Sequence, residues 1–229
     1  MRAVCLIGPT GSGKSSIALS VAESFSAEIV NFDSRQVYRD FPITTDQPGR
    51  QERARATHRL YGFLEPWEKV DAGGFSALAE QEMDKVAARG RIPLLVGGTG
   101  LYLQAILYGL DPIPRTPRAI RERIRGECDS LGPEALHARL AEVDPKAAAA
   151  YSPRDRQRVT RALEVFEHTG RPLSWWQSGD VSRSPRHSAL LIGLRPDREK
   201  LRELLKQRIE EMLQQGALQE VRQAWQKCP

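Results

Sequence analysis

The sequence contains little cysteine. Its 229 residues include only Cys5, Cys128 and Cys228, which are far apart and form no CxxC pair. This scarcity argues against a disulfide framework and against a cysteine-based zinc site, and it is typical of proteins of a reducing cytoplasm. The four histidines show no metal-ligand spacing either. We therefore expect a cytoplasmic protein whose chemistry does not depend on a cysteine or histidine metal centre.

Long apolar runs are also missing. No stretch approaches the roughly 18 apolar residues that a membrane-spanning helix needs, and the N-terminus runs directly into a predicted strand, which leaves no room for a signal peptide. The composition, 40% hydrophobic and 28% charged, is that of an ordinary soluble protein. The net charge of +5, from 34 basic and 29 acidic residues, is a small excess. The length suits one large domain, or one domain with a smaller insertion.

A complete phosphate-binding loop of the form GxxxxGK[ST] is present near the N-terminus. It consists of Gly8, Pro9, Thr10, Gly11, Ser12, Gly13, Lys14 and Ser15. An apolar strand is predicted over residues 3–7 and a helix after the loop, so that backbone N–H groups and the helix dipole face the ligand. Lys14 adds positive charge and the Ser15 hydroxyl can hold magnesium. We expect a diphosphate or triphosphate here, in preference to a purely structural glycine-rich turn.

Strands alternate with helices along much of the chain. Strands are predicted over residues 28–32, 92–96 and 189–194, and helices over 74–90, from 101 to 107 and from 197 onward. This alternation predicts the α/β class: a P-loop NTPase-like parallel sheet flanked by helices, with a helical insertion domain. Ligands bind such sheets at the carboxyl ends of the strands. The phosphate-binding loop, Asp33 and Thr99 each follow a strand, so we expect them to meet in one crevice.

The insertion is predicted over residues 113–186, and the α/β core over 1–112 and 187–229. Ser152 is the predicted N-cap of a helix that places Arg154, Arg158 and Arg161 on one face. Arginines also crowd the start of the insertion, at Arg115, Arg118, Arg121, Arg123 and Arg125. These arginines could track nucleic-acid phosphates, or they could form a solvated face with acidic neighbours such as Asp155.

The choice among phosphate enzymes depends on a second acidic residue. An ATP-hydrolysing motor needs an acid at the end of a hydrophobic strand to hold magnesium and position water. The strand over 92–96 ends in Gly97-Gly98-Thr99, with no acid, and the available carboxylate is Asp33. This pattern favours an enzyme that transfers a group carried on a phosphate.

Four spaced motifs, in order along the whole chain, resemble the tRNA dimethylallyltransferase (isopentenyl-tRNA transferase) family. They are the phosphate-binding loop with Asp33-Ser34-Arg35-Gln36-Val37-Tyr38; residues 92–102, IPLLVGGTGLY; residues 155–165, DRQRVTRALEV; and Asp197-Arg198 followed by residues 208–212, RIEEM, and Glu220-Val221.

The resemblance implies transfer of a five-carbon allyl group from dimethylallyl diphosphate to the exocyclic amine of an adenine beside the tRNA anticodon. Loop amides, Lys14 and magnesium on Ser15 would stabilise the leaving diphosphate. Asp33 would be the base that takes the amine proton. Thr99 would help to place the acceptor nucleotide or the diphosphate, and Arg208 would bind the diphosphate from the far side. We expect a monomer that has no membrane partner.

The resemblance also implies a set of contacts with the tRNA anticodon stem-loop. The residues that would contact tRNA are Asp33, Ser34, Arg35, Gln36, Thr99, Arg121, Gln157, Arg158, Val159, Thr160 and Arg161. Sequence-specific RNA recognition favours loops whose bases can be splayed out, and a phosphate-tracking surface makes binding sensitive to salt.

Alternatives remain at the level of function and of single residues. The chain could be a P-loop small-molecule kinase, a prenyltransferase acting on free adenine nucleotides, or a non-catalytic RNA-binding protein. Asp33 could cap a strand, Thr99 could cap the next helix and Arg208 could be an exposed helix residue. We expect Trp175 and Trp176 to form a partly buried pair and not a base-stacking platform.

The sequence departs from the family pattern at three points. Where the family usually reads Gly-Thr-Ala-Lys-Pro, this chain has Thr44-Thr45-Asp46-Gln47-Pro48, so Gln47 replaces the usual lysine. Leu204 stands where an arginine is common, one turn before Arg208. The resemblance further implies that members continue for some tens of residues past the position where this chain stops.

Overall fold

The computed structural model describes residues 2–178 and 184–227, which form two compact units. Unit 1 comprises Met1–Leu110 and Ser184–Pro229, and unit 2 is Asp111–Arg183. The boundaries predicted from the sequence, after residues 112 and 186, lie a few residues from these. No helix among the described residues is both long enough and apolar enough to cross a membrane.

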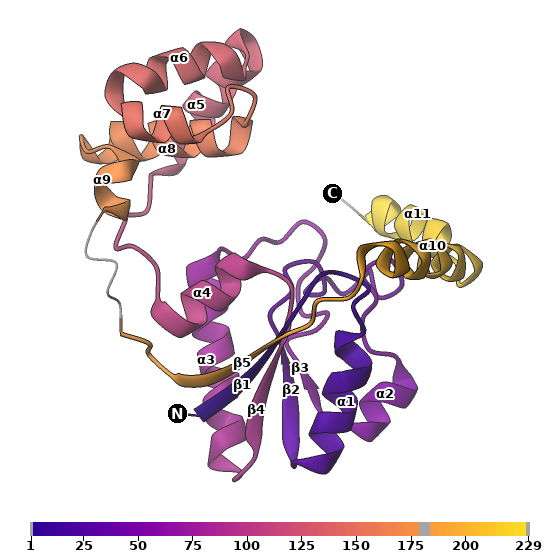
Figure 1. Ribbon diagram of the computed structural model, residues 1–229. Helices are drawn as coiled ribbons and strands as arrows, with labels where there is room; N and C mark the ends of the chain where they lie inside the picture. Colours follow the sequence, from indigo (N-terminus) through magenta and orange to yellow (C-terminus); the bar gives the residue numbers. More distant parts are fainter. Residues whose placement is uncertain (1, 179–183, 228–229) are drawn as a thin grey trace. The chain divides into compact units, whose positions relative to one another are not determined.

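Unit 1 is built on a five-stranded parallel sheet in the order β3-β2-β4-β1-β5 (Figure 1). Its strands are β1 (Arg2–Ile7), β2 (Ala27–Asn31), β3 (His58–Arg59), β4 (Ile92–Gly97) and β5 (Ser188–Gly193). Val4 of β1 pairs with Leu94 of β4 on one side and with Leu190 of β5 on the other. The predicted fold class is confirmed, although the two-residue strand β3 was not predicted.

Helices cover both faces of this sheet because its strand side chains alternate between two apolar sides. Cys5 and Leu95 face one core, which includes Phe75 and Met83 of α3 (Ala72–Ala88) and residues of α4 (Gly100–Tyr108). Leu94 and Val96 face the other core, against α1 (Lys14–Ser24). Figure 1 shows α3 and α4 on one side of the sheet, with α1 and α2 (Arg50–Arg55) on the other.

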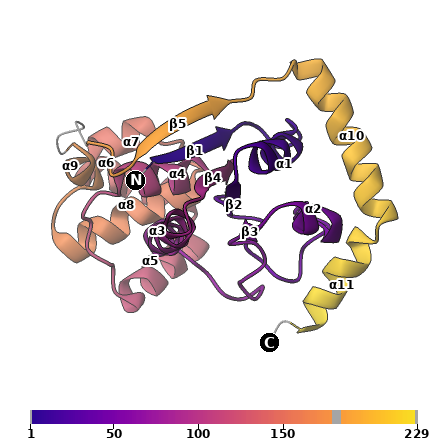
Figure 2. The same ribbon diagram turned by 90° about the horizontal axis from the view of Figure 1, so that it is seen from below.

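Two further helices, α10 (Arg198–Gln214) and α11 (Ala217–Lys227), follow β5 and run one after the other along one side of unit 1 (Figure 2). Helix α10 packs on the phosphate-binding loop at Gly11. This residue has a φ of +80°, and a Cβ added to it would lie 2.9 Å from Leu205 Cδ2. Only glycine therefore suits this position.

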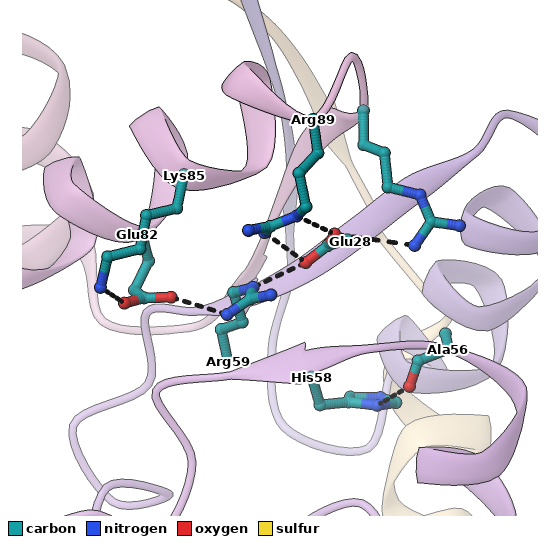
Figure 3. Close-up of polar contacts among 8 residues, drawn as sticks. Glu28, Ala56, His58, Arg59, Glu82, Lys85 and Arg89 are labelled. Atoms are coloured by element: carbon teal, nitrogen blue, oxygen red, sulfur yellow. Dashed lines mark hydrogen bonds and ion pairs between the residues drawn. The ribbon is translucent and has the colours of Figure 1, made fainter.

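An ion-pair network joins four segments at the amino ends of β2 and β4 (Figure 3). The Glu28 carboxylate, 3% exposed, accepts hydrogen bonds from Arg59 Nε at 2.6 Å and from Arg89 at 3.0 and 3.1 Å. Arg59 also bonds Glu82 at 2.9 Å. Burial by itself would raise the pKa of Glu28, but Arg89 and Arg59 hold it below its ordinary value. The network attaches β3 to β2 and to α3.

Unit 2 is a helical bundle, with no strand among its described residues. Its helices are α5 (Arg118–Leu131), α6 (Pro133–Val143), α7 (Pro145–Ala150), α8 (Arg156–Thr169) and α9 (Leu173–Gln177). Val159 and Leu163 of α8 are fully buried among residues of α5 and α6, such as Ile124 and Leu140. Helix α8 therefore forms the centre of this unit.

The predicted N-cap of α8 is wrong by three residues. Asp155 is the N-cap, and its side chain accepts from the backbone N–H of Arg158 at 3.0 Å. The Ser152 hydroxyl accepts from Arg154 N in the preceding turn, at 3.3 Å. An aspartate and a serine compete for the same role in this segment, and the residue that places its oxygen beside the first free N–H groups of the helix caps it.

Candidate active site

The phosphate-binding loop leads from β1 into α1, and Lys14 is the first residue of that helix. Gly13 is the N-cap, with a φ of 82° and no side-chain cap, so no side chain caps the N–H groups at the start of α1. Lys14 Nζ donates to the carbonyl oxygens of Gly8 and Pro9, at 2.9 and 2.8 Å. Burial lowers the pKa of Lys14; Asp33 and Asp46 act in the opposite direction, and Arg208 adds to the lowering.

Ser12 within this loop carries a buried hydroxyl that has no hydrogen-bond partner in the described part of the chain. A buried hydroxyl without a partner is costly, and in a native structure it commonly indicates an atom that a ligand or water satisfies. Ser12 lines the same cavity as Lys14 and Ser15. The loop therefore fits an anion that carries several oxygen acceptors.

Asp33 lies directly beyond the carboxyl end of β2, where the chain turns. Its Oδ1 accepts from the backbone N–H of Arg35 at 2.9 Å, and its own N–H donates to the buried Asn31 side chain at 2.8 Å. Asn31 Nδ2 in turn donates to the carbonyl oxygens of Asp33 and Leu60. Asp33 thus caps the end of the strand, as one of the alternatives for this residue predicts. It also lines the cavity together with the phosphate-binding loop. Sequence reasoning missed Asn31, which fixes this turn.

Thr99, after β4, is joined to the residue that follows Asp33. Its Oγ1 accepts from Ser34 N at 2.9 Å and lies 3.2 Å from Ser34 Oγ. Although Thr99 is the N-cap residue of α4, its side chain makes no capping bond. Neither Thr99 nor Ser34 is among the residues that line the cavity, whereas Arg35 and Gln36 are.

One cavity of about 900 Å³ brings the loop, Asp33 and Arg208 together. Arg208, on α10, is half-buried and not an exposed helix residue: its side chain is 23% exposed and its Nη2 lies 3.3 Å from Asp46 Oδ2. The apolar part of the wall includes Tyr38, Phe41, Tyr61, Pro66, Leu204 and Val221. The sequence did not single out this apolar wall. The cavity therefore combines a polar floor with a surface suited to a small hydrocarbon group.

Tyr61 lies on the wall of the cavity that Asp33 also lines. Burial, reinforced by the negative charge of Asp33, raises the pKa of Tyr61 far above its ordinary value. The phenol therefore stays protonated at physiological pH and can only act as a neutral hydrogen-bonding group. No motif indicated Tyr61 in advance.

The remaining sequence-predicted contacts lie in unit 2. Gln157 and Arg158 are exposed, as is Arg121, and Arg161 is partly exposed. Val159 and Thr160 are buried: Val159 belongs to the core, and the Thr160 hydroxyl bonds the carbonyl of Arg156 at 2.8 Å. The expectation that these two side chains contact RNA is therefore not supported by the structure. One helix turn presents some residues to solvent and turns the others inward.

The three arginines that were expected to share one helix face have intramolecular acidic partners, and Arg154 lies outside α8, which begins only at Arg156. Arg154 pairs with Glu134 at 3.3 Å, and Arg158 pairs with Asp155 at 2.8 Å. Arg161 lies 3.6 Å from the buried Glu164 and donates to Thr116 Oγ1 at 3.0 Å. These pairs match the alternative of a solvated face with local acidic partners. An arginine in an exposed ion pair can exchange its carboxylate for an RNA phosphate with little loss of free energy, whereas an arginine in a buried pair cannot.

Nearby, the two tryptophans form the expected partly buried pair. The rings of Trp175 and Trp176 meet edge to face at 5.0 Å. Trp176 packs against the unit 2 core, while Trp175 is 48% exposed beneath the Arg171 guanidinium.

Comparison with protein families places residues 36–228 in a match to the model described as IPP transferase. A protein of Maridesulfovibrio salexigens named tRNA dimethylallyltransferase is 50% identical over 226 residues, which cover 99% of this chain and 73% of that protein. A protein of the same name from Parvibaculum lavamentivorans is 46% identical over 219 residues, covering 96% of this chain and 69% of its own length.

Solved structures give the same result. The tRNA isopentenylpyrophosphate transferase of Bacillus halodurans is 31% identical, with a TM-score of 0.66 over 99% of this chain and 70% of that one. A eukaryotic dimethylallyltransferase, whose structures show it acting on tRNA, is 30% identical. Its TM-score is 0.82 over 98% of this chain and 56% of that one.

Proposed function

The chain belongs to the IPP transferase family, and from this premise we propose that it transfers a dimethylallyl group from dimethylallyl diphosphate to an adenine in tRNA. The acceptor is the exocyclic amine of an adenine beside the anticodon, and diphosphate is released. One observation carries the proposal: a phosphate-binding loop, a carboxylate and an arginine share a cavity that also has an apolar wall. A diphosphate and a short hydrocarbon chain match these two surfaces.

The reaction begins with charge separation in the donor. As the bond between the allylic carbon and the diphosphate oxygen breaks, negative charge accumulates on the diphosphate. The N–H groups at the start of α1 and the cations Lys14 and Arg208 lie on the cavity wall where they can stabilise that charge. The hydroxyl of Ser12, buried and unpaired within the described residues, supplies a further donor.

Magnesium suits the same oxygen donors. Ser15 and Asp33 both line the cavity, and Mg²⁺ prefers one or two protein oxygens together with phosphate oxygens. We propose that Ser15 would hold the ion, which when bound neutralises charge on the diphosphate. Among the described residues no cluster of three histidine, cysteine or acidic side chains offers a dedicated metal cage.

The carboxylate of Asp33 orients the nucleophile and accepts its proton. An exocyclic amine is weakly nucleophilic because its lone pair is delocalised into the adenine ring. As the new nitrogen–carbon bond forms, the amine proton moves to Asp33 and diphosphate departs. The backbone N–H of Arg35 donates to one carboxylate oxygen of Asp33. The hydrogen bond from the Asp33 backbone N–H to the Asn31 side chain fixes the turn. This fixed geometry is what a positioned base requires.

The acceptor adenine must leave its stack to reach a cavity of this kind. We propose that Arg35 and Gln36 contact the flanking nucleotides, and that Gln157 and the exposed arginines of unit 2 contact the anticodon stem-loop. We also propose that the protein acts as a monomer in the cytoplasm. Light scattering during gel filtration, with and without tRNA, measures the oligomeric state.

A two-acceptor transfer assay tests the function. Dimethylallyl diphosphate labelled in its allyl group is incubated with the protein and either unmodified tRNA or AMP. We expect label in tRNA and none in AMP. Label in AMP alone would identify a prenyltransferase of free nucleotides, and label in neither would refute the proposal. Incubation with ATP labelled at its γ-phosphate and a mixture of small metabolites separates the kinase alternative, which predicts phosphorylated products.

A further inference from the structure

Residues 41–47, between β2 and α2, form one wall of the cavity although they contain neither helix nor strand. We call this segment loop 41–47. Side-chain amides hold it from within: Gln36 Nε2 donates to the carbonyls of Thr45 and Asp46 at 3.0 and 2.6 Å. Gln47 Nε2 donates to the Tyr38 carbonyl at 2.7 Å. The shape of this wall therefore depends on side-chain contacts.

A carboxylate from the far end of the chain holds the same loop from outside. Glu220, on α11, accepts from Ile43 N at 2.6 Å, from Thr44 N at 2.8 Å and from Thr44 Oγ1 at 2.7 Å. Both carboxylate oxygens are used, and the side chain is half-buried. Hydrogen bonds from backbone N–H groups to a carboxylate are about twice as strong as neutral ones. Glu220 is thus the main link between α11 and the loop.

Loop 41–47 also contacts Arg208, through Asp46. Asp46 has a φ of 54°, unusual for a residue with a side chain, and its carboxylate lies 3.3 Å from Arg208. Helix α10, which carries Arg208, packs through Leu205 on Gly11 of the phosphate-binding loop. The position of Arg208 is therefore set from two sides, by α10 itself and by Asp46.

We propose that Glu220 is a positioning residue for the diphosphate end of the site. By fixing Ile43 and Thr44, it holds loop 41–47 as a cavity wall and places Asp46 so that Arg208 is kept beside the phosphate-binding loop. Glu220 itself is not among the residues that line the cavity. This inference rests on the proposed function for the identity of the ligand. It assigns a role to a residue that the transfer chemistry does not require.

The test replaces Glu220 by glutamine, which has nearly the same shape. The single side-chain oxygen of glutamine can still accept a hydrogen bond from the loop. The amide NH₂ takes the place of the other carboxylate oxygen, where it faces N–H or O–H donors and cannot accept from them. We expect faster hydrogen exchange in peptides covering residues 42–47, and a KM for dimethylallyl diphosphate roughly tenfold higher, the effect of losing one hydrogen bond to a charged group. The KM for tRNA should change by less than about twofold, because the contacts proposed for tRNA are untouched.

Two further variants make the test specific. Glu203→Gln, an exposed glutamate on α10, removes the same charge and should leave exchange and KM unchanged. Thr44→Val removes only the hydroxyl bond to Glu220 and should raise the same KM by a smaller factor. Combined with Glu220→Gln it should raise the KM by less than the product of the two single effects, because both changes weaken the same link between Glu220 and loop 41–47.

The outcomes are distinguishable. Faster exchange with an unchanged KM would mean that the contact only stabilises the loop, and the proposal would be overturned. The proposal would also be overturned if Glu220→Gln and Glu203→Gln raised the KM for dimethylallyl diphosphate equally. A rise in the KM for tRNA in place of that for dimethylallyl diphosphate would overturn it as well. If the unaltered protein transferred nothing, the proposed function would fail in that assay. The exchange data and binding of dimethylallyl diphosphate would still report on Glu220.

Discussion

Thr99 Oγ1 accepts a hydrogen bond of 2.9 Å from the backbone N–H of Ser34, and this contact joins the carboxyl ends of β4 and β2. The two residues are far apart in the sequence, and Asp33 immediately precedes one of them. The hydroxyl of Thr99 makes this contact and does not cap helix α4. Its effect on catalysis should therefore pass through the position of Asp33.

Thr99→Val should lower kcat by roughly fivefold to a hundredfold, because leaving the backbone N–H of Ser34 without its acceptor costs about 1–3 kcal/mol. The KM for dimethylallyl diphosphate should change little. Thr99→Ser keeps the hydroxyl and should retain most of the activity. If both variants lost activity equally, the methyl group and not the hydroxyl would be the essential part. Single-turnover transfer to tRNA measures the chemical step directly.

Asp33→Asn should reduce transfer by at least about a hundredfold, because an amide cannot accept the proton that a general base removes. Binding of dimethylallyl diphosphate should persist, since the phosphate-binding loop is untouched. Lys14→Ala is the matched comparison and should weaken diphosphate binding in the first place. Calorimetric titration together with the transfer assay separates the two effects. An Asp33→Asn enzyme with normal turnover would exclude Asp33 as the base.

Arg121 is an exposed arginine on α5, and Arg158 is an exposed arginine paired with Asp155. Replacing either with alanine should weaken tRNA binding and reduce the slope of log affinity against log salt by up to about one. The effect at Arg158 should be smaller, because Asp155 already neutralises part of its charge. Arg55→Ala, on α2 in unit 1 and paired with Glu23, is the control. Equal slopes for all variants would argue against an RNA contact by unit 2.

The network around Glu28 predicts a pH-dependent contribution to stability. Because the arginines lower the pKa of Glu28 in the folded state, its ionised form stabilises the fold above the ordinary glutamate pKa of about 4.3. That contribution is lost as the pH falls through the lowered value. Glu28→Gln should therefore cost roughly 2 kcal/mol of unfolding free energy at pH 7, less than a fully buried pair because Arg89 and Arg91 are partly exposed.

Urea unfolding of the two proteins from pH 7 to pH 3 checks this expectation. The difference between them should shrink only at the acidic end of that range. A constant difference would show that the cost comes from packing and not from the charge of Glu28.

Much of unit 1 follows from local patterns. Strands β1, β2, β4 and β5 were predicted because short apolar runs end at glycine or at a polar turn, and the strand–loop–helix order then puts three motifs at one sheet edge. Strand β3 has only His58 and Arg59, and long-range contacts with Glu28 and β2 define it. A two-residue segment carries no period, so no sequence pattern could have indicated it.

The site shows the same division. The phosphate-binding loop and Asp33 follow from spacing, since each occupies a fixed place beyond a strand. The partners of Glu220 and of Arg208 depend on how residues distant in the chain meet, which a single sequence does not encode locally. The burial of Val159 shows a further limit, because a motif names consecutive residues while a helix divides them between its faces.

The hydrogen bonds of Lys14 within its own loop affect how an anion binds there. Two of the three N–H donors of its ammonium group are bonded to carbonyls of its own loop, so the loop has its curved shape before any anion arrives. The third donor can then meet a phosphate oxygen without breaking either internal bond. Binding therefore requires little rearrangement of this segment. The entropy of ordering it is lost on folding and not during each catalytic cycle.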